Sequence, residues 1–98
     1  MRKYFAAVTG VDENFGRLLQ KLKDDGLYDD TIIVLTADHG ELLCAHRLWS
    51  KHVWYEESVA VPFIIKYGDR YIKGRTESVL NGVDIMPTIL SLMGVTNS

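Results

Sequence analysis

The residues best suited to chemistry are Asp38 and His39, which follow an apolar β-branched run, residues 31–36, and precede Gly40. Neighbouring side chains of a strand point to opposite faces, so this carboxylate and imidazole can reach one cation only where the chain turns. Gly40 would allow that turn, and ligand sites of open α/β sheets lie at the carboxyl ends of strands. The pattern predicts a metal site. The alternative is that Asp38 caps a short helix near Gly40 while His39 is solvated.

Lys51 is the next candidate, because it stands among large aromatic residues, with Trp49 before it and Trp54 and Tyr55 after it. A lysine partly shielded from water by aromatic rings becomes a strong point charge for an anionic substrate. The competing interpretation is a surface lysine whose stem lies on apolar side chains while its ammonium group stays in water.

Other reactive side chains lack a partner at a defined spacing. His46 and His52 flank Lys51, and each could be a proton donor, a metal ligand or an ordinary hydrogen-bonding residue. No base is placed for Cys44, so we interpret it as a small packed hydrophobic residue. The adjacent pair of residues 56–57, both glutamate, would diverge on a helix, which favours a solvated face or a helix start over an acid–base pair.

The elements that must position these residues begin with an amphipathic helix over residues 3–25. Gly26 is its expected stop, because glycine readily takes the left-handed conformation that ends helices. The run over residues 31–36 predicts a strand buried on both faces, as in parallel sheets covered by helices. A second strand is expected over residues 61–65, with Pro62 at its start. The helix prediction rests on apolar residues spaced alternately by four and three: Tyr4, Val8, Val11, Phe15, Leu18 and Leu22.

A long connection, a surface segment and a C-terminal helix complete the chain. The connection, residues 38–58, is rich in tryptophan and histidine, which favours a functional loop over disorder. A hairpin or loop is expected over residues 67–77, and a helix over residues 84–94 with Asp84 as its N-cap and Gly94 as its stop. This order predicts an α/β fold with mostly parallel strands covered by helices. Two strands are too few for a complete sheet, so we expect either a fragment of a larger domain or a homo-oligomer formed through exposed sheet edges.

Composition and charge exclude several classes of partner. The 98 residues are 47% hydrophobic and 24% charged, which is ordinary for a globular chain. A net charge of −2 gives no electrostatic reason to expect nucleic acid, and no apolar run reaches the roughly 18 residues that span a bilayer. We therefore expect neither nucleic acid nor membrane as a partner. The one cysteine cannot form an internal disulfide, and the sequence indicates no cellular compartment.

Taken in order, five blocks of the chain resemble the sulfatases of the alkaline phosphatase superfamily. The family's helix pattern, Tyr-x-Ala-x-Val with a later Gly-x-Leu-Leu-x-x-Leu, is matched by residues 4–22. Its strand pattern, which ends in Thr-(Ser/Ala)-Asp-(His/Asn)-Gly, is matched by residues 29–40. The later blocks are His-x-Leu-Trp-x-Lys at 46–51, Tyr-Glu-Glu-Ser with Val-Pro at 55–62, and Asp-x-x-Pro-Thr-x-Leu-x-x-x-Gly at 84–94. The resemblance implies one partial sulfatase-like α/β domain over residues 1–98.

By position, the resemblance implies that Asp38 and His39 are ligands of a divalent metal, and that Lys51 contacts the sulfate and the leaving ester oxygen. The metal of this family is usually calcium, and the imidazole leaves manganese open. The family nucleophile is a formylglycine made within Cys/Ser-x-Pro-x-Arg. Cys44 is followed by Ala-His-Arg-Leu, which does not fit, so the nucleophile is expected upstream of this chain.

These features predict a fragment of a sulfatase that hydrolyses a small-molecule or glycan sulfate ester in its full-length parent, and the isolated chain is expected to be inactive. One alternative is a phosphodiesterase or phosphoethanolamine transferase of the same superfamily, in which His52 would be a metal ligand. Another is a non-catalytic, self-associating α/β module. Arg47 stands where the family often has glycine, and Ala60 where it often has arginine.

Overall fold

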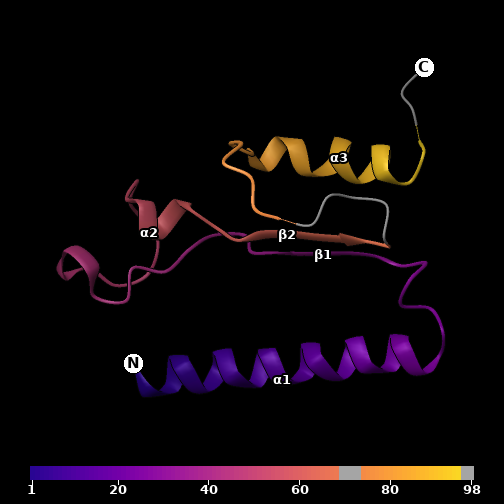
Figure 1. Ribbon diagram of the computed structural model, residues 1–98. Helices are drawn as coiled ribbons and strands as arrows, with labels where there is room; N and C mark the ends of the chain where they lie inside the picture. The colour runs from indigo at the N-terminus through magenta and orange to yellow at the C-terminus, as the bar shows by residue number, and fades with distance from the viewer. Residues whose placement is uncertain (69–73, 96–98) are drawn as a thin grey trace.

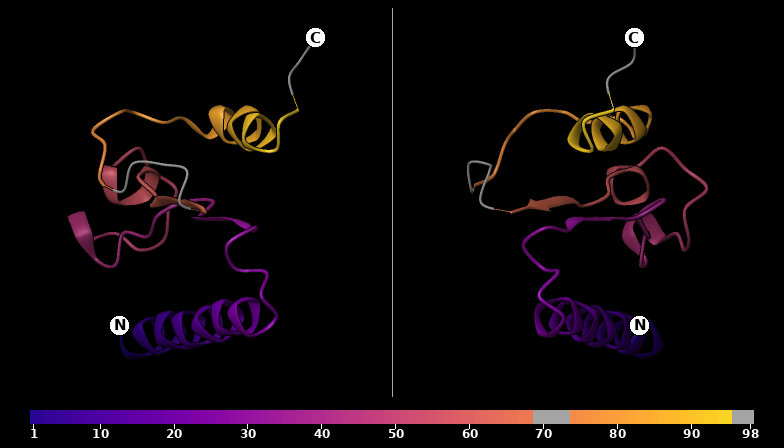
Figure 2. Two further views of the ribbon diagram at one scale, coloured as in Figure 1. Left: turned by 45° about the vertical axis from the view of Figure 1, so that its right-hand side comes forward. Right: turned by 90° about the vertical axis from the view of Figure 1, so that its right-hand side faces the viewer.

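The computed structural model describes residues 1–68 and 74–95 (Figure 1). Helix α1 lies on one side of the two strands and α3 on the other, so the elements form three layers (Figures 1 and 2). This arrangement of helices and strands confirms the predicted α/β class. The elements are α1 (Arg2–Asp24), β1 (Ile32–Thr36), η1 (Ala45–Arg47), α2 (Glu56–Val59), β2 (Phe63–Tyr67), η2 (Gly82–Asp84) and α3 (Ile85–Leu92).

Helix α1 forms where the apolar spacing predicts it, within one residue at each end. It stops at Gly26, which has a φ of +69° in the left-handed region. Leu27 and Tyr28 then donate their backbone N–H groups to the carbonyl oxygen of Leu22, which satisfies the end of the helix. Within residues 1–68 and 74–95, no helix is long and apolar enough to cross a membrane.

The strands β1 and β2 pair antiparallel, with Ile32 opposite Tyr67 and Thr36 opposite Phe63. The prediction of parallel strands is therefore wrong for this pair. A parallel pair needs a crossover that carries the chain back along the length of the sheet, usually a helix. The connection of residues 37–62 holds only the short η1 and α2 and returns to the end of β1 that it left, so β2 must run the opposite way.

Helix α3 ends at the predicted place, since Gly94 has a φ of +76°. Asp84 is its N-cap residue as predicted, but the Asp84 side chain makes no capping hydrogen bond to α3. The Asp84 carboxylate accepts a hydrogen bond from the backbone N–H of Asn81 at 2.8 Å and closes a capping box around η2. Of the surface segment expected over residues 67–77, residues 69–73 lie outside the described residues.

The chain buries little of its own surface. It exposes 8510 Å², whereas a folded monomer of 11.1 kDa exposes about 5,700 Å². Its radius of gyration is 16.4 Å, against about 13 Å for a compact domain of this length. Among the described residues only Leu42 and Ser58 are buried, and the strands are half-buried where full burial is expected. The chain by itself therefore leaves much of its apolar surface uncovered.

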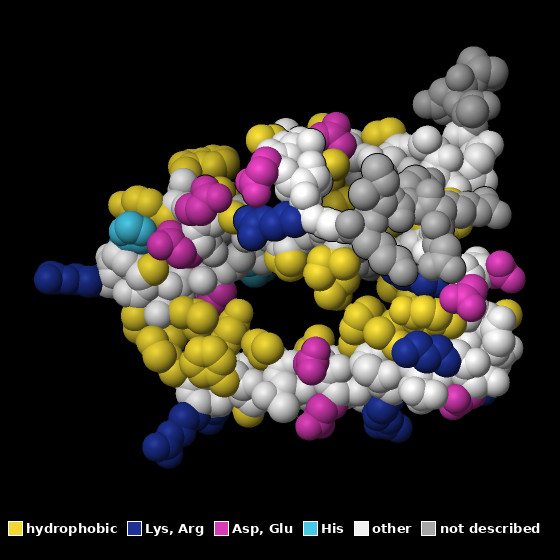
Figure 3. Space-filling model, in the orientation of Figure 1, with side chains coloured by type: hydrophobic (Ala, Val, Ile, Leu, Met, Phe, Trp, Pro, Cys, Tyr) yellow, Lys and Arg dark blue, Asp and Glu magenta, His cyan; other side chains and the backbone are white. Residues whose placement is uncertain are grey.

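The uncovered apolar surface faces a hollow between α1 and the sheet, visible as an opening lined with hydrophobic side chains (Figure 3). A pocket of about 580 Å³ lies between the apolar face of α1 and the end of β1. The predicted face of α1 is therefore directed at the sheet without closing on it. Residues of α1 that line this pocket include Tyr4, Val8, Val11 and Phe15.

Candidate functional site

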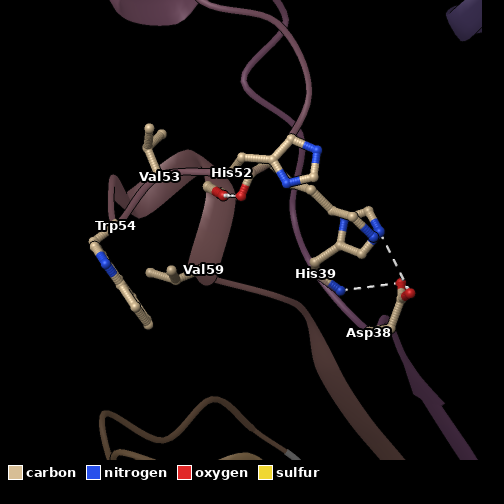
Figure 4. Close-up of a pocket in the computed structure, with 8 residues that line it drawn as sticks. Asp38, His39, His52, Val53, Trp54 and Val59 are labelled. Carbon is tan, nitrogen blue, oxygen red and sulfur yellow. Dashed lines mark hydrogen bonds and ion pairs between the residues drawn. The ribbon is translucent and has the colours of Figure 1, made fainter.

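Asp38 and His39 lie directly beyond β1, where the chain leaves the sheet. The Asp38 carboxylate accepts a hydrogen bond from the backbone N–H of His39 at 3.0 Å. Its other oxygen, Oδ2, lies 3.4 Å from Nε2 of His39 (Figure 4). Nδ1 of His39 lies 2.7 Å from the carbonyl oxygen of Gly40. The two side chains therefore lie close enough together to bind one cation, as the predicted metal site requires.

The hydrogen bonds of His39 decide which ring nitrogen is free. A carbonyl oxygen only accepts, so Nδ1 carries the hydrogen that it donates to Gly40. Nε2 is then the nitrogen that faces the Asp38 carboxylate, across 3.4 Å. A metal cation bound between them would take one ligand atom from each side chain. Metal-binding histidines generally donate their other N–H to a carbonyl or carboxylate in the same way.

The donor set fits a divalent cation in part. Two ligands at right angles, each about 2.3–2.6 Å from a calcium ion, are separated by about 3.3–3.7 Å, and the distance between Asp38 Oδ2 and His39 Nε2 falls in this range. Within the described residues, no three His, Cys, Asp or Glu side chains gather around one point. Asp38 and His39 could thus supply two ligands, and calcium needs six to eight.

Gly40 is required for close packing, not for an unusual backbone angle. A Cβ atom at this position would lie 2.1 Å from the carbonyl oxygen of Glu57. The Gly40 N–H also donates to the carbonyl oxygen of Ser58 at 2.9 Å. The segment after β1 is therefore held directly against α2, and any side chain at Gly40 would push them apart.

The loop of residues 41–50 closes on itself before Lys51. Oε1 of Glu41 accepts the backbone N–H of Ser50 at 2.7 Å, and Leu42 donates its N–H to the carbonyl oxygen of Ser50 at 3.1 Å. Leu42 is 2% exposed and anchors the base of this loop. The two ends of the loop therefore lie side by side, which places Lys51 near Asp38.

This loop carries the strained backbone of the described chain. Five non-glycine residues have positive φ, the left-handed region that costs an L-residue roughly 1–2 kcal/mol. Such strain persists only where surrounding contacts enforce it, and it concentrates at functional sites. The residues are Leu43 (+47°), Cys44 (+73°), His46 (+54°), Arg47 (+61°) and Ser50 (+70°).

Lys51 lines the same pocket as Asp38 and His39, a cavity of about 430 Å³. In the part of the chain that the structure describes, its ammonium group has no ion-pair or hydrogen-bond partner, whereas its carbonyl oxygen accepts the Ser58 hydroxyl at 2.6 Å. The structure thus brings together all three predicted site residues. The other lining residues are His52, Val53, Trp54, Ser58 and Val59 (Figure 4).

Of Cys44, His46 and His52, only His52 lines the pocket. His46 stacks on Tyr55 at a ring separation of 3.9 Å, and its Nε2 lies 3.3 Å from Oε2 of Glu57. It therefore joins the loop to the start of α2 and does not line the pocket. Cys44 is exposed and is also absent from the pocket wall.

Sequence reasoning missed two supporting residues, Glu41 and Ser58. A carboxylate just before a long loop is a weak signal for Glu41, because its partner, Ser50, lies nine residues away. Ser58 stands in the recognised Tyr-Glu-Glu-Ser block, but nothing in that block indicates that its hydroxyl reaches back to Lys51.

Comparison with known proteins gives a consistent result. The family model Sulfatase matches residues 1–95. The chain is 45% identical over 97% of its length to N-acetylglucosamine-6-O-sulfatase of Bacteroides thetaiotaomicron, and 39% identical over its whole length to Endo-4-O-sulfatase of the same organism. The crystal structure of yidJ from Bacteroides fragilis, a protein assigned to the sulfatases, superposes with a TM-score of 0.87 over 97% of this chain at 43% identity.

These relatives are much longer than this chain, which spans 17% of the N-acetylglucosamine-6-O-sulfatase, 20% of the Endo-4-O-sulfatase and 21% of the solved structure. The large uncovered apolar surface agrees with that proportion. The match of sequence, fold and block order over nearly all of its residues shows that this chain belongs to the sulfatase family.

Proposed function

We propose that this chain supplies part of the active site for hydrolysis of a sulfate ester. Asp38 and His39 would be ligands of a divalent metal, and Lys51 would contact the sulfate and the leaving ester oxygen. One observation carries the proposal: these residues line one pocket, where Nε2 of His39 lies 3.4 Å from the Asp38 carboxylate and the Lys51 ammonium has no partner among the described residues.

Charge explains why this arrangement suits sulfate-ester hydrolysis. A divalent metal, when bound, supplies Lewis-acid charge to the sulfate oxygens. Asp38 and His39 would fix its place, since His39 is oriented by its hydrogen bond to Gly40. Lys51 would stabilise the negative charge that develops on the leaving oxygen, where a fixed cation is most effective. Calcium suits the carboxylate, and the imidazole makes manganese equally testable.

The nucleophile must come from outside these residues. No Cys/Ser-x-Pro-x-Arg sequence occurs in the chain, and Cys44 is exposed away from the pocket. We therefore propose that a formylglycine is supplied by the rest of the enzyme. We expect the isolated chain to show no turnover of an aryl sulfate, and metal-dependent turnover by the chain alone would contradict this proposal.

A chimera tests the proposed roles directly. The matching segment of the Bacteroides thetaiotaomicron N-acetylglucosamine-6-O-sulfatase is replaced by this chain, which shares 45% identity with it. We expect the chimera to hydrolyse N-acetylglucosamine 6-sulfate, and Lys51→Ala or His39→Ala to lower kcat/KM by about 10²–10³-fold. Lys21→Ala, a change in an exposed lysine of α1, is the matched control and should stay within about twofold. A Lys51→Ala chimera as active as its parent would exclude the proposed role of Lys51.

The position of His52 supports a second candidate function, phosphodiester hydrolysis. It lines the pocket, where its imidazole could be a further metal ligand for such a reaction. His52→Ala in the chimera separates the two functions. Unchanged metal affinity favours the sulfatase, and a large loss together with phosphodiesterase turnover in the parent chimera favours the second candidate.

A further inference from the structure

Ser58 is the one buried polar residue of the described chain, at 3% exposure, and it has no place in the chemistry proposed above. It belongs to α2, a helix of four residues that is too short to be stable by itself. A buried hydroxyl in such a helix needs partners, and its partners lie on the two segments that form the pocket.

Two hydrogen bonds connect Ser58 to both walls of the site. Its Oγ donates to the carbonyl oxygen of Lys51 at 2.6 Å. Its own carbonyl oxygen accepts the N–H of Gly40, next to His39, at 2.9 Å. Because Gly40 packs so closely on Glu57, the segment after β1 cannot shift past α2. One residue therefore spans the gap between the metal-ligand segment and the lysine segment.

We propose that Ser58 is a positioning residue that sets where Lys51 lies relative to Asp38 and His39; the proposal rests on the proposed function. The backbone before Lys51 is held through Ser50 by Glu41 and Leu42, and the backbone after it is held by the Ser58 hydroxyl. Without that hydroxyl the peptide group of Lys51 is free on one side.

A small tilt there is amplified along the side chain. The lysine nitrogen lies about 6 Å from its Cα when the side chain is extended, so a tilt of about 10° moves it by about 1 Å. A misplacement of about 1 Å can cost about 100-fold in rate when it affects a group that must meet the transition state. A purely structural hydroxyl would instead affect stability without changing the place of Lys51.

The test uses the chimera described above, in which the rest of the enzyme can supply further metal ligands, with ¹³C-labelled lysine and Mn²⁺ as a paramagnetic probe. Mn²⁺ held at Asp38 and His39 broadens nearby proton signals with the inverse sixth power of distance. Lys66 reports the fold in the same spectrum, because its Nζ lies 4.1 Å from the centre of the Tyr28 ring, which shifts its signals only in the folded chain. Free Mn²⁺, measured by electron paramagnetic resonance, gives the metal affinity.

We expect the strongest broadening at Lys51 in the parent chimera. Ser58→Ala should lower it about two- to threefold, the effect of a displacement of about 1 Å at a separation of about 6 Å, without changing the metal affinity or the Lys66 shift. Ser58→Thr, which keeps the hydroxyl, should restore it. Ser91→Ala, an exposed serine of α3, should match the parent.

The outcomes that overturn the proposal differ from those that overturn the proposed function. Equal broadening of Lys51 in the parent and in Ser58→Ala removes the positioning role alone. A parent chimera in which Mn²⁺ broadens Lys51 no more than the distant Lys21 removes the proposed function and, with it, this role. If Ser58→Ala loses the Lys66 shift, Ser58→Cys decides, because the thiol is a weaker donor of similar size. Intermediate broadening then supports the role, and parental broadening overturns it.

Discussion

Replacing Gly40 with alanine would place a methyl carbon 2.1 Å from the carbonyl oxygen of Glu57, 2.9 Å from its carbonyl carbon and 3.1 Å from the carbonyl oxygen of Ala60. All three atoms belong to backbone, so no side chain can rotate away to make room. Relief requires α2 to retreat from the segment after β1 by about 1.4 Å, because ordinary contacts between carbon and other heavy atoms are about 3.5 Å or longer.

That retreat breaks the contacts that hold the pocket together. The hydrogen bond from Gly40 to Ser58, now 2.9 Å, would lengthen beyond bonding distance, and the bond from Ser58 to Lys51 depends on the same helix. Each lost bond costs about 0.5–1.5 kcal/mol, and the overpacking itself about 1–3 kcal/mol. With both hydrogen bonds lost, we expect Gly40→Ala to lower the free energy of unfolding by about 2–6 kcal/mol.

Urea unfolding of the chain, followed by far-ultraviolet circular dichroism of its helices, measures this change. Gly16→Ala is the matched control, because a Cβ at Gly16 meets nothing within 4 Å and the residue lies inside α1. That substitution should stabilise the chain by about 0.5–1 kcal/mol, since alanine favours a helix interior over glycine. The two identical chemical changes are thus expected to have opposite signs.

A Gly40→Ala chain within about 0.5 kcal/mol of the parent, the usual range for an inconsequential surface change, would refute the reasoning. It would mean that α2 does not rest on the segment after β1, and the contact between Gly40 and Glu57 would not position the pocket. An equal loss in both alanine variants would point to a general effect of the substitution, unrelated to the close approach at Gly40.

Two further predictions concern the loop before Lys51. Arg47 has a φ of +61°, so Arg47→Gly should stabilise the chain by about 0.5–1 kcal/mol after the entropy cost of glycine. Arg17→Gly, inside α1, is the control and should destabilise the chain by about 1 kcal/mol. Urea midpoints measure both changes, and a loss of stability in Arg47→Gly would show that contacts of the Arg47 side chain outweigh the backbone strain. Glu41→Ala should speed hydrogen exchange at the Ser50 amide and lower the free energy of unfolding by about 1.5–3 kcal/mol. Glu41→Gln should give an intermediate effect, because it keeps an uncharged acceptor. Unchanged exchange at Ser50 in Glu41→Ala would contradict the role of this carboxylate.

The sequence predicted the parts of the fold that depend on local pattern. The spacing of apolar residues in residues 3–25 reports a helix because side chains three and four positions apart share one face, and Gly26 ends it as expected. The β-branched run gave β1 within one residue. The candidate site residues were also accessible from sequence, because Asp38 and His39 follow that strand directly and Lys51 stands among aromatic residues.

Only the tertiary structure decided how these parts meet. The direction of β2 depends on where residues 37–62 return, and no local pattern encodes that return. Lys51 reaches the pocket because Glu41 closes a loop across nine residues, and Ser58 fixes it from seven residues away. Gly40 is needed for the approach of a backbone that lies far along the chain. Local sequence patterns indicate on which face of a helix or strand a side chain lies. Contacts between distant segments form only when the chain folds back on itself, so no local pattern predicts them.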